Sequence, residues 1–132
     1  MLQPDAYERR EFIRVTTEIP VAYKFFSTTG ELEFDDILEG VTSNISRDGM
    51  LLQGKHLQKN MAAPLLLGKI VIGVNLFLPN QEDPVKALSR VKWIEAGDEQ
   101  GADSSLMGLN FKEITKESID KILKFIISTQ MP

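Results

Sequence analysis

The sequence of 132 residues contains no cysteine and a single histidine. Without cysteine the chain cannot form disulfides, zinc–thiolate sites, iron–sulfur centres or a thiol nucleophile. The histidine, His56, has no nucleophile or cluster of metal ligands beside it in the sequence, and we interpret it as a solvated loop residue. Because these residues assemble no nucleophile, base and orienting group, we predict no enzyme activity, no metal site and no cofactor.

Long hydrophobic runs are also missing. The longest apolar stretch, residues 70–78, is interrupted by Gly73 and Asn75 and is too short to span a bilayer. The N-terminal stretch MLQPDAYERREF holds no apolar run of signal-peptide length. We therefore expect a cytoplasmic protein that does not insert into a membrane.

Positive charge is in deficit, with 15 basic against 19 acidic side chains and a net charge of −4. A protein that binds nucleic acid without sequence preference usually carries the opposite sign. We therefore predict no DNA or RNA partner and keep a small barrel that binds single-stranded nucleic acid only as a lesser alternative. An anionic small ligand stays compatible with the composition, because basic residues are concentrated near the N-terminus.

Short runs of alternating hydrophobicity, separated by turn residues, make up most of the chain. The clearest run places Ile70, Ile72, Val74, Leu76 and Leu78 at a period of two. The runs recur about every ten residues with no helix between them, which favours an antiparallel barrel or a sandwich. We predict strands at residues 19–26, 32–41, 50–53, 69–78, 85–96 and 106–111.

The segments outside these runs give weaker or different signals. The polar run at residues 42–49 predicts a bent strand end or a loop, and residues 55–64 predict a loop or a short helical turn. We expect Trp93 and the methionines to lie in the core.

The C-terminal segment has the pattern of a helix. Thr115 is a candidate N-cap with Glu117 in the first turn. An apolar stripe of helical spacing follows at Ile119, Ile122, Leu123 and Ile126. Phe125 and Ile127 lie off this stripe, so we expect them to cover the end of the barrel, with a homodimer or partner surface as the alternative.

The densest basic cluster consists of Arg9, Arg10 and Arg14. Arg10 and Arg14 are four residues apart, a spacing that directs both side chains to one face in a helical turn or in a strand. The flat guanidinium group matches both the oxygens of a phosphate and the O6 and N7 acceptors of guanine. Taken alone, the cluster is explained more simply as a solvated face that pairs with Glu8 and Glu11.

A second polar motif, Asn-x-Ser-x-x-Gly, is formed by Asn44, Ser46 and Gly49. Asn and Ser side chains cap local backbone groups or reach a ligand, and glycine permits a positive φ or a close backbone approach. Taken alone, this motif is explained more simply as a capped turn between two strands.

The two motifs in this order, within an all-β chain, resemble the PilZ family. Further similarity lies in the Val-x-Trp strand at Val91 and Trp93, in the Gly-Leu-Asn-Phe sequence that begins at Gly108, and in the terminal helix. The resemblance extends from about Arg9 to that helix. The stretch from Lys55 to Gly68 departs from the family, because it is longer than the usual connection to the next strand.

The resemblance implies an all-β fold, a six-stranded antiparallel β-barrel with a C-terminal α-helix, and a bacterial receptor for the second messenger cyclic di-GMP that is not an enzyme. It implies that Arg9, Arg10 and Arg14 bind the ligand from a flexible arm, and that Asn44, Ser46 and Gly49 line the barrel side of the pocket. In the family, an arginine at the position of Arg9 is associated with two stacked ligand molecules.

The resulting organisation has three parts. We expect an arm at residues 1–17, a barrel at residues 18–114 and a helix at residues 115–130 that packs on the barrel. The arm would close over the ligand and signal to a separate, unidentified partner protein. The alternative is a PilZ-like scaffold that binds other proteins but no nucleotide.

Overall fold

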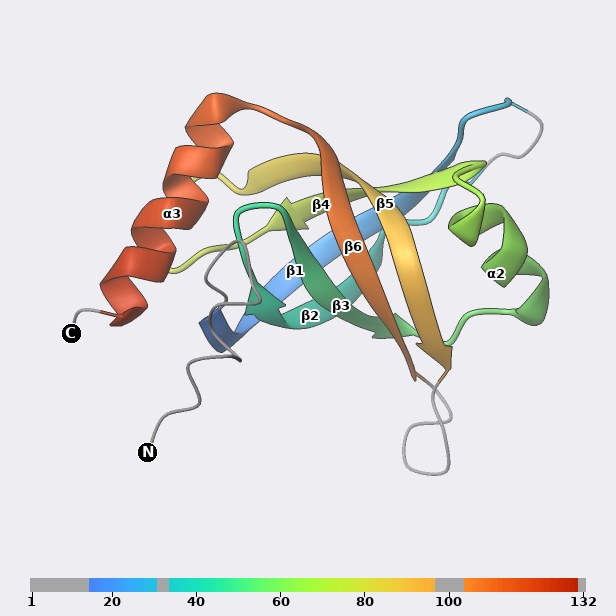
Figure 1. Ribbon diagram of the computed structural model, residues 1–132, viewed down its shortest axis with the longest axis horizontal. Helices are drawn as coiled ribbons and strands as arrows, with labels where there is room; N and C mark the ends of the chain where they lie inside the picture. The colour runs from blue at the N-terminus through green and yellow to red at the C-terminus, as the bar shows by residue number, and fades with distance from the viewer. Residues whose placement is uncertain (1–14, 31–33, 97–103, 131–132) are drawn as a thin grey trace, which may run out of the picture.

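The computed structural model describes residues 15–30, 34–96 and 104–130. Within these ranges, six antiparallel strands close into a barrel in the order β1-β2-β3-β6-β5-β4 (Figure 1). The prediction of an all-β, six-stranded antiparallel barrel with a C-terminal helix is therefore confirmed. The strands are β1 (Val15–Ser27), β2 (Leu38–Ile45), β3 (Gly49–Lys55), β4 (Ile70–Leu76), β5 (Val85–Ala96) and β6 (Ser104–Ile114), and the helices are α2 (Lys59–Leu66) and α3 (Lys116–Gln130).

The barrel closes through β1, which is long enough to pair with two neighbours. Its first part, from Val15 to Tyr23, pairs with β2, and its last part, from Val21 to Ser27, pairs with β4. Closure gives every strand of the barrel two hydrogen-bonded neighbours.

The core follows the alternation that the sequence predicts. Every second residue from Ile19 to Phe25 of β1 and along β4 points inward, and most of these side chains are almost completely buried. Burying each large aliphatic side chain contributes about 1.5–3 kcal/mol to folding. The inward residues of these two strands are Ile19, Val21, Tyr23, Phe25, Ile70, Ile72, Val74 and Leu76.

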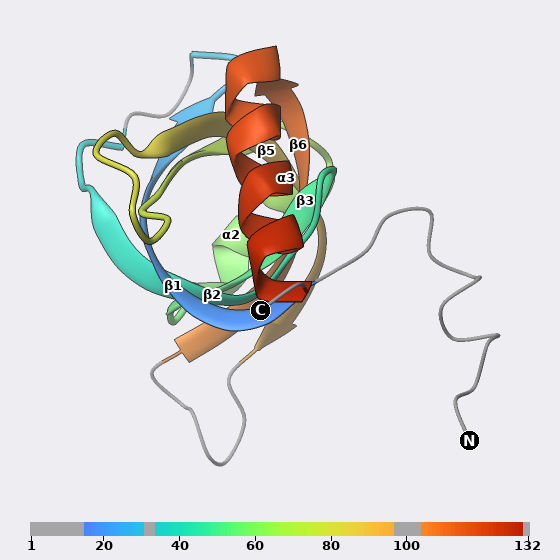
Figure 2. The ribbon, with the colours of Figure 1, turned by 90° about the vertical axis from the view of Figure 1, so that its left-hand side faces the viewer.

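The two helices lie at opposite ends of the barrel (Figure 1). Helix α3 crosses one opening, where Ile122 and Ile126 are buried and Ile127 is 56% exposed (Figure 2). Helix α2 packs against β4 and β5 with Leu65 fully buried. It lies in the segment for which the sequence left a loop or a short helical turn open. Neither described helix has both the length and the apolar character that crossing a bilayer requires.

Trp93 contradicts the expectation that it lies in the core. Its side chain is 43% exposed and covers Gly108 from outside the barrel, where a Cβ on Gly108 would come within 2.3 Å of the indole nitrogen. The register of β5 against β6 shifts between Val91 and Trp93, so the inward alternation of β5 is broken at that point. Met50 and Met107 are buried as expected and Met61 is partly buried, while Met1 and Met131 lie outside the described residues.

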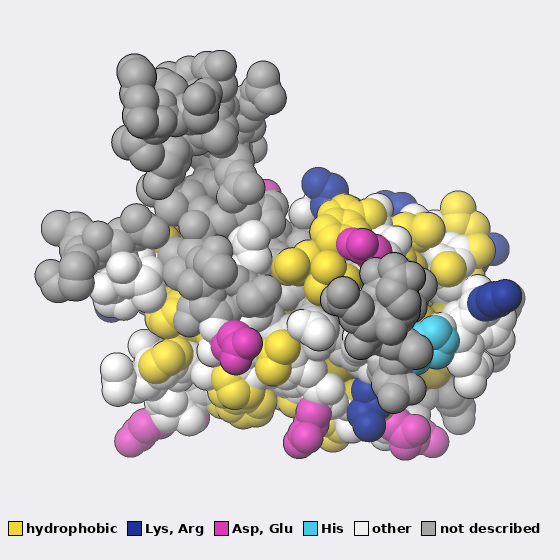
Figure 3. All heavy atoms as spheres, turned by 90° about the horizontal axis from the view of Figure 1, so that it is seen from below, with side chains coloured by type: hydrophobic (Ala, Val, Ile, Leu, Met, Phe, Trp, Pro, Cys, Tyr) yellow, Lys and Arg dark blue, Asp and Glu magenta, His cyan; other side chains and the backbone are white. Residues whose placement is uncertain are grey.

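The described part of one face of the molecule mixes residue types. Seen from below, hydrophobic side chains are interspersed with basic and acidic ones, and the single histidine is in view (Figure 3). His56 is exposed, which confirms its interpretation as a solvated residue.

Candidate ligand-binding site

The turn between β2 and β3 carries the Asn-x-Ser-x-x-Gly motif and is held by Ser46. The Ser46 N–H donates to the carbonyl oxygen of Gly49 at 2.9 Å, and the Ser46 hydroxyl donates to the Asp48 carboxylate. The hydroxyl also lies 3.4 Å from the Gly49 oxygen, and the side chain is fully buried. Ser46 therefore stabilises the turn, as the simpler interpretation of the motif held.

Gly49 is required by packing between strands. A Cβ at this position would lie 2.0 Å from the carbonyl oxygen of Leu109 on β6, and Gly49 does not have a positive φ. The Phe111 N–H also donates to the Asp48 carbonyl oxygen at 2.9 Å. Of the two roles open to this glycine, the structure selects close backbone approach, which locks the turn onto β6.

Asn44 is the motif residue that keeps an unused polar atom. It lies in β2, and its Oδ1 is buried with no hydrogen-bond partner among the described residues. A buried carbonyl oxygen without a partner costs about 1–3 kcal/mol. Such an atom calls for a donor that the described residues do not supply, and it fits a ligand with N–H groups, such as a guanine edge.

Thr42 holds Asn44 in place from two positions earlier in β2. Its hydroxyl donates to the Asn44 carbonyl oxygen at 3.0 Å, and the Asn44 N–H lies 3.3 Å from the same hydroxyl oxygen. The register of β2 against both neighbours is irregular here, which marks a β-bulge. Sequence reasoning missed the positioning roles of Thr42 and Asp48; the available signal was their place within the polar run at residues 42–49.

The start of β1 lies beside Asn44. Thr16 pairs with Asn44 and Val15 pairs with Ile45, and paired residues of antiparallel strands have Cα atoms about 4.5–5.5 Å apart. The predicted ligand contacts Arg9, Arg10 and Arg14 lie outside the described residues. The structure thus brings Asn44, Ser46 and Gly49 together at one turn, next to the residues that directly follow Arg14 in the chain.

The chain is similar to known proteins in sequence and in fold. A family model for the PilZ domain matches residues 8–128. Comparison with curated protein sequences gave no match. The chain superposes on the inhibitor of motility MotI/DgrA from Bacillus subtilis with a TM-score of 0.66 and 17% identity, covering 93% of this chain and 51% of that one. The chain therefore spans about half the length of that protein.

Two similar structures were solved with a ligand. The PilZ domain of YcgR from Escherichia coli with c-di-GMP gives a TM-score of 0.54 and 12% identity, covering 91% of this chain and 90% of that one. The PlzA protein from Borreliella burgdorferi in complex with c-di-GMP gives a TM-score of 0.53 and 13% identity, covering 98% of this chain and 57% of that one. At these identities the likeness establishes the fold.

The closed barrel, the helix across its opening and the turn packed through Gly49 onto β6 define a small β-barrel domain with a C-terminal helix. The family model covers most of its length, and the chain belongs to the PilZ domain family.

Proposed function

We propose that this chain is a receptor for cyclic di-GMP that binds the ligand between its N-terminal arm and the β2–β3 turn. One observation carries the proposal: the first described residues of β1, which directly follow Arg14 in the chain, pair with Asn44 and Ile45, and the Asn44 amide oxygen is buried with no partner among the described residues. This pairing supports a site in which the arginines before β1 and the β2–β3 turn bind the same ligand.

The two halves have complementary chemistry for this ligand. Arg10 and Arg14, with Arg9 beside them, offer donors that match phosphate oxygens and guanine acceptors. Asn44 offers an acceptor for a guanine N–H, while Ser46 and Gly49 keep the turn in shape for the ligand to rest on. Because the chain is otherwise acidic, with a net charge of −4, the arginines are the natural counter-charge for two phosphates.

Residues 15–17 of the expected arm belong to β1, so ligand binding would change the state of the segment before Val15 while the barrel and the helix at 115–130 stay in place. The phosphates neutralise arginines that otherwise repel one another, so the closed arm binds ligand more tightly than the open arm. The ordering of the arm costs conformational entropy, which ligand contacts must offset. A separate partner protein then distinguishes the two states of the arm.

Calorimetric titration with cyclic di-GMP tests the site. Arg10→Ala and Arg14→Ala each remove a charge-assisted contact and should weaken binding by about 1.5–3 kcal/mol. Asn44→Ala removes a neutral acceptor and should cost about 1 kcal/mol. The same titration gives the stoichiometry, which decides between one ligand and the two stacked ligands that Arg9 suggests.

Lys59→Ala is the matched control, because Lys59 is exposed at the start of α2, at the end of the barrel opposite α3. This variant should bind cyclic di-GMP like the wild type. If the arginine and asparagine variants also bind like the wild type, the assignment of the site is wrong.

The alternative is a PilZ scaffold that binds proteins and no nucleotide. This alternative is favoured because the fold alone explains why serine and glycine stand at these positions. Ser46 holds the turn through hydrogen bonds, and Gly49 packs closely against β6. It predicts no heat of binding with cyclic di-GMP at high micromolar concentration, whereas the receptor predicts saturation well below that range.

A further inference from the structure

A groove of about 420 Å³ runs on the outside of the barrel between α2 and the strands β5 and β6. It contains three basic side chains, and its described lining holds no carboxylate. The charge of the groove is therefore opposite in sign to the net charge of the chain, which is −4. The groove is lined by Leu66, Arg90, Lys92, Asn110, Phe111 and Lys112, together with Val91.

Arg90 is fixed in this groove by the end of α2. One of its terminal nitrogens donates to the Leu66 carbonyl oxygen at 3.3 Å, and the guanidinium packs against Gly68, which has a φ of 79°. A cation at the C-terminus of a helix is stabilised by the unpaired carbonyls there. Arg90 is therefore positioned before any partner arrives, although it is exposed, as Lys92 and Lys112 are.

The groove also has an apolar rim. Leu66 is 42% exposed and the following Leu67 is 64% exposed, both at the end of α2. Phe111 adds a partly buried ring on the β6 side. Exposed aliphatic side chains beside a basic groove match a partner that combines carboxylates with an aliphatic anchor.

The groove is connected to the β2–β3 turn through β6. Asn110 of the groove pairs with Gly49 on one side and with Arg90 on the other. Phe111 donates its N–H to the Asp48 carbonyl oxygen. A structural change at the turn can therefore be transmitted to the groove through Asn110 and Phe111, which are adjacent in β6.

A second groove of similar volume, on the outer face of β1, β4 and β5, lacks these properties. Its lining includes Lys24, Phe26 and Lys86, but also the carboxylate of Glu113. No residue that pairs with the turn contributes to it. Its lysines therefore provide a matched comparison.

We propose that the groove between α2, β5 and β6 is the docking surface for an acidic segment of a partner protein that inserts an aliphatic side chain beside Leu66. This inference rests on the proposed receptor function, for which it names the output surface. The charges set the rate and specificity of association, and the apolar anchor supplies contact area.

The probe is a fluorescein-labelled synthetic peptide that has leucine at helical spacing and glutamate at all the remaining positions. A control peptide carries lysine in place of glutamate. Fluorescence anisotropy with the full chain should show binding of the acidic peptide that weakens with added salt, and no comparable binding of the basic peptide. The double variant K92E/K112E should weaken the acidic peptide by about tenfold, because each reversal replaces an attraction by a repulsion.

The double variant K24E/K86E carries the same charge change in the other groove and should bind the acidic peptide within about twofold of the wild type. Equal losses in the two double variants, or no binding of the acidic peptide, would overturn the proposal. Tighter binding of a single-stranded oligonucleotide than of the peptide would overturn it in favour of nucleic acid.

Titration of the same proteins with cyclic di-GMP separates the two proposals. If the wild type binds the peptide in the groove but not cyclic di-GMP, the receptor function fails and the docking surface stands. If the wild type binds cyclic di-GMP and the K92E/K112E variant binds the acidic peptide as tightly as the wild type, only the proposed docking surface fails.

Discussion

At the scale of single residues, Tyr23 shows how the barrel accommodates a polar atom in its core. The ring is 2% exposed, and its hydroxyl oxygen accepts a hydrogen bond from the Lys55 N–H at 2.9 Å. Space for the hydroxyl exists only because residue 54 is glycine, since a Cβ there would lie 2.3 Å from the hydroxyl oxygen. Burial raises the pKa of Tyr23 above its ordinary value of 10.0, and the bond from Lys55 offsets part of this rise.

Tyr23 should make the stability of the protein fall in alkaline solution. Above about pH 10 the unfolded chain loses the phenol proton first, because only the folded state raises this pKa, so the free energy of unfolding decreases with pH. The stability contribution is complete below the unfolded pKa and is lost as the pH rises toward the folded one. Urea unfolding across this range checks the slope.

Two proteins are compared, the Tyr7→Phe variant, in which Tyr23 is the only tyrosine, and the same variant with Tyr23→Phe added. Adding Tyr23→Phe should remove the part of the slope due to this phenol and lower the stability at neutral pH by about 1 kcal/mol through the lost hydrogen bond. Identical slopes in the two proteins would show that Tyr23 ionises normally.

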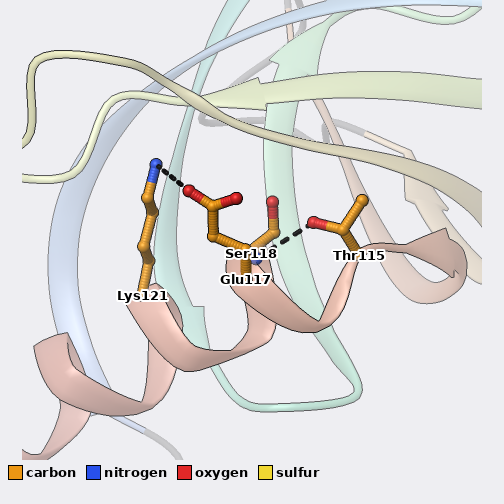
Figure 4. Close-up of polar contacts among 4 residues, drawn as sticks. All are labelled: Thr115, Glu117, Ser118 and Lys121. Atoms are coloured by element: carbon orange, nitrogen blue, oxygen red, sulfur yellow. Dashed lines mark hydrogen bonds and ion pairs between the residues drawn. The ribbon is translucent and has the colours of Figure 1, made fainter.

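At the scale of elements, α3 begins where its sequence predicts. The Ser118 N–H donates to the Thr115 hydroxyl at 3.1 Å, and Glu117 lies 3.8 Å from Lys121 one turn later (Figure 4). The capping bond satisfies a backbone donor that has no partner within the helix. The ion pair is exposed on the Glu117 side and contributes little, so the cap is the stronger signal.

Thr115→Ala should therefore lower the free energy of unfolding by about 1 kcal/mol. Thr115→Ser keeps the hydroxyl and serves as the control, with a change of only a few tenths of that amount. Chemical denaturation with equal m-values in all three proteins gives the difference. A loss of similar size in the serine variant would assign the effect to the methyl group of Thr115.

Helix α2 shows the limit of local signals. It contains Pro64, its N-cap Gln58 makes no side-chain capping bond, and it has no acidic residue in its first turn. What holds it is tertiary contact: Leu65 is buried against the barrel and Arg90 of β5 binds its C-terminal end. The sequence therefore left a loop and a short helical turn equally open for this segment.

At the scale of the whole molecule, the proposed ligand binding would be linked to folding. The proposed site joins the start of β1 to the β2–β3 turn, two parts that meet only in the folded barrel. Cyclic di-GMP should therefore bind the folded state and not the unfolded chain. Any ligand with that preference stabilises the fold in proportion to the logarithm of its concentration.

At a ligand concentration of about one hundred times the dissociation constant, the stabilisation should be about 2.7 kcal/mol. For a domain of this size, that corresponds to a rise in Tm of roughly 10 °C. Thermal unfolding followed by circular dichroism measures the shift, which Asn44→Ala should reduce at the same ligand concentration. Guanosine monophosphate is the control ligand, and an equal shift with it would contradict recognition of the cyclic dinucleotide.

The sequence by itself determined the elements whose signals are local. Period-two alternation identified β4 and β5, and a capping residue followed by an apolar stripe identified α3, because these patterns depend on neighbours a few positions away. The motif residues Asn44, Ser46 and Gly49 could also be named from the sequence.

Only the tertiary structure decided what those residues do. The bulges in β2 and β5, the burial of the Asn44 amide oxygen and the outward position of Trp93 depend on strand register. So does the contact of Gly49 with Leu109. Register is set by pairing between distant segments, and a shift of one residue moves a side chain to the other face of the sheet, so no local pattern reveals it.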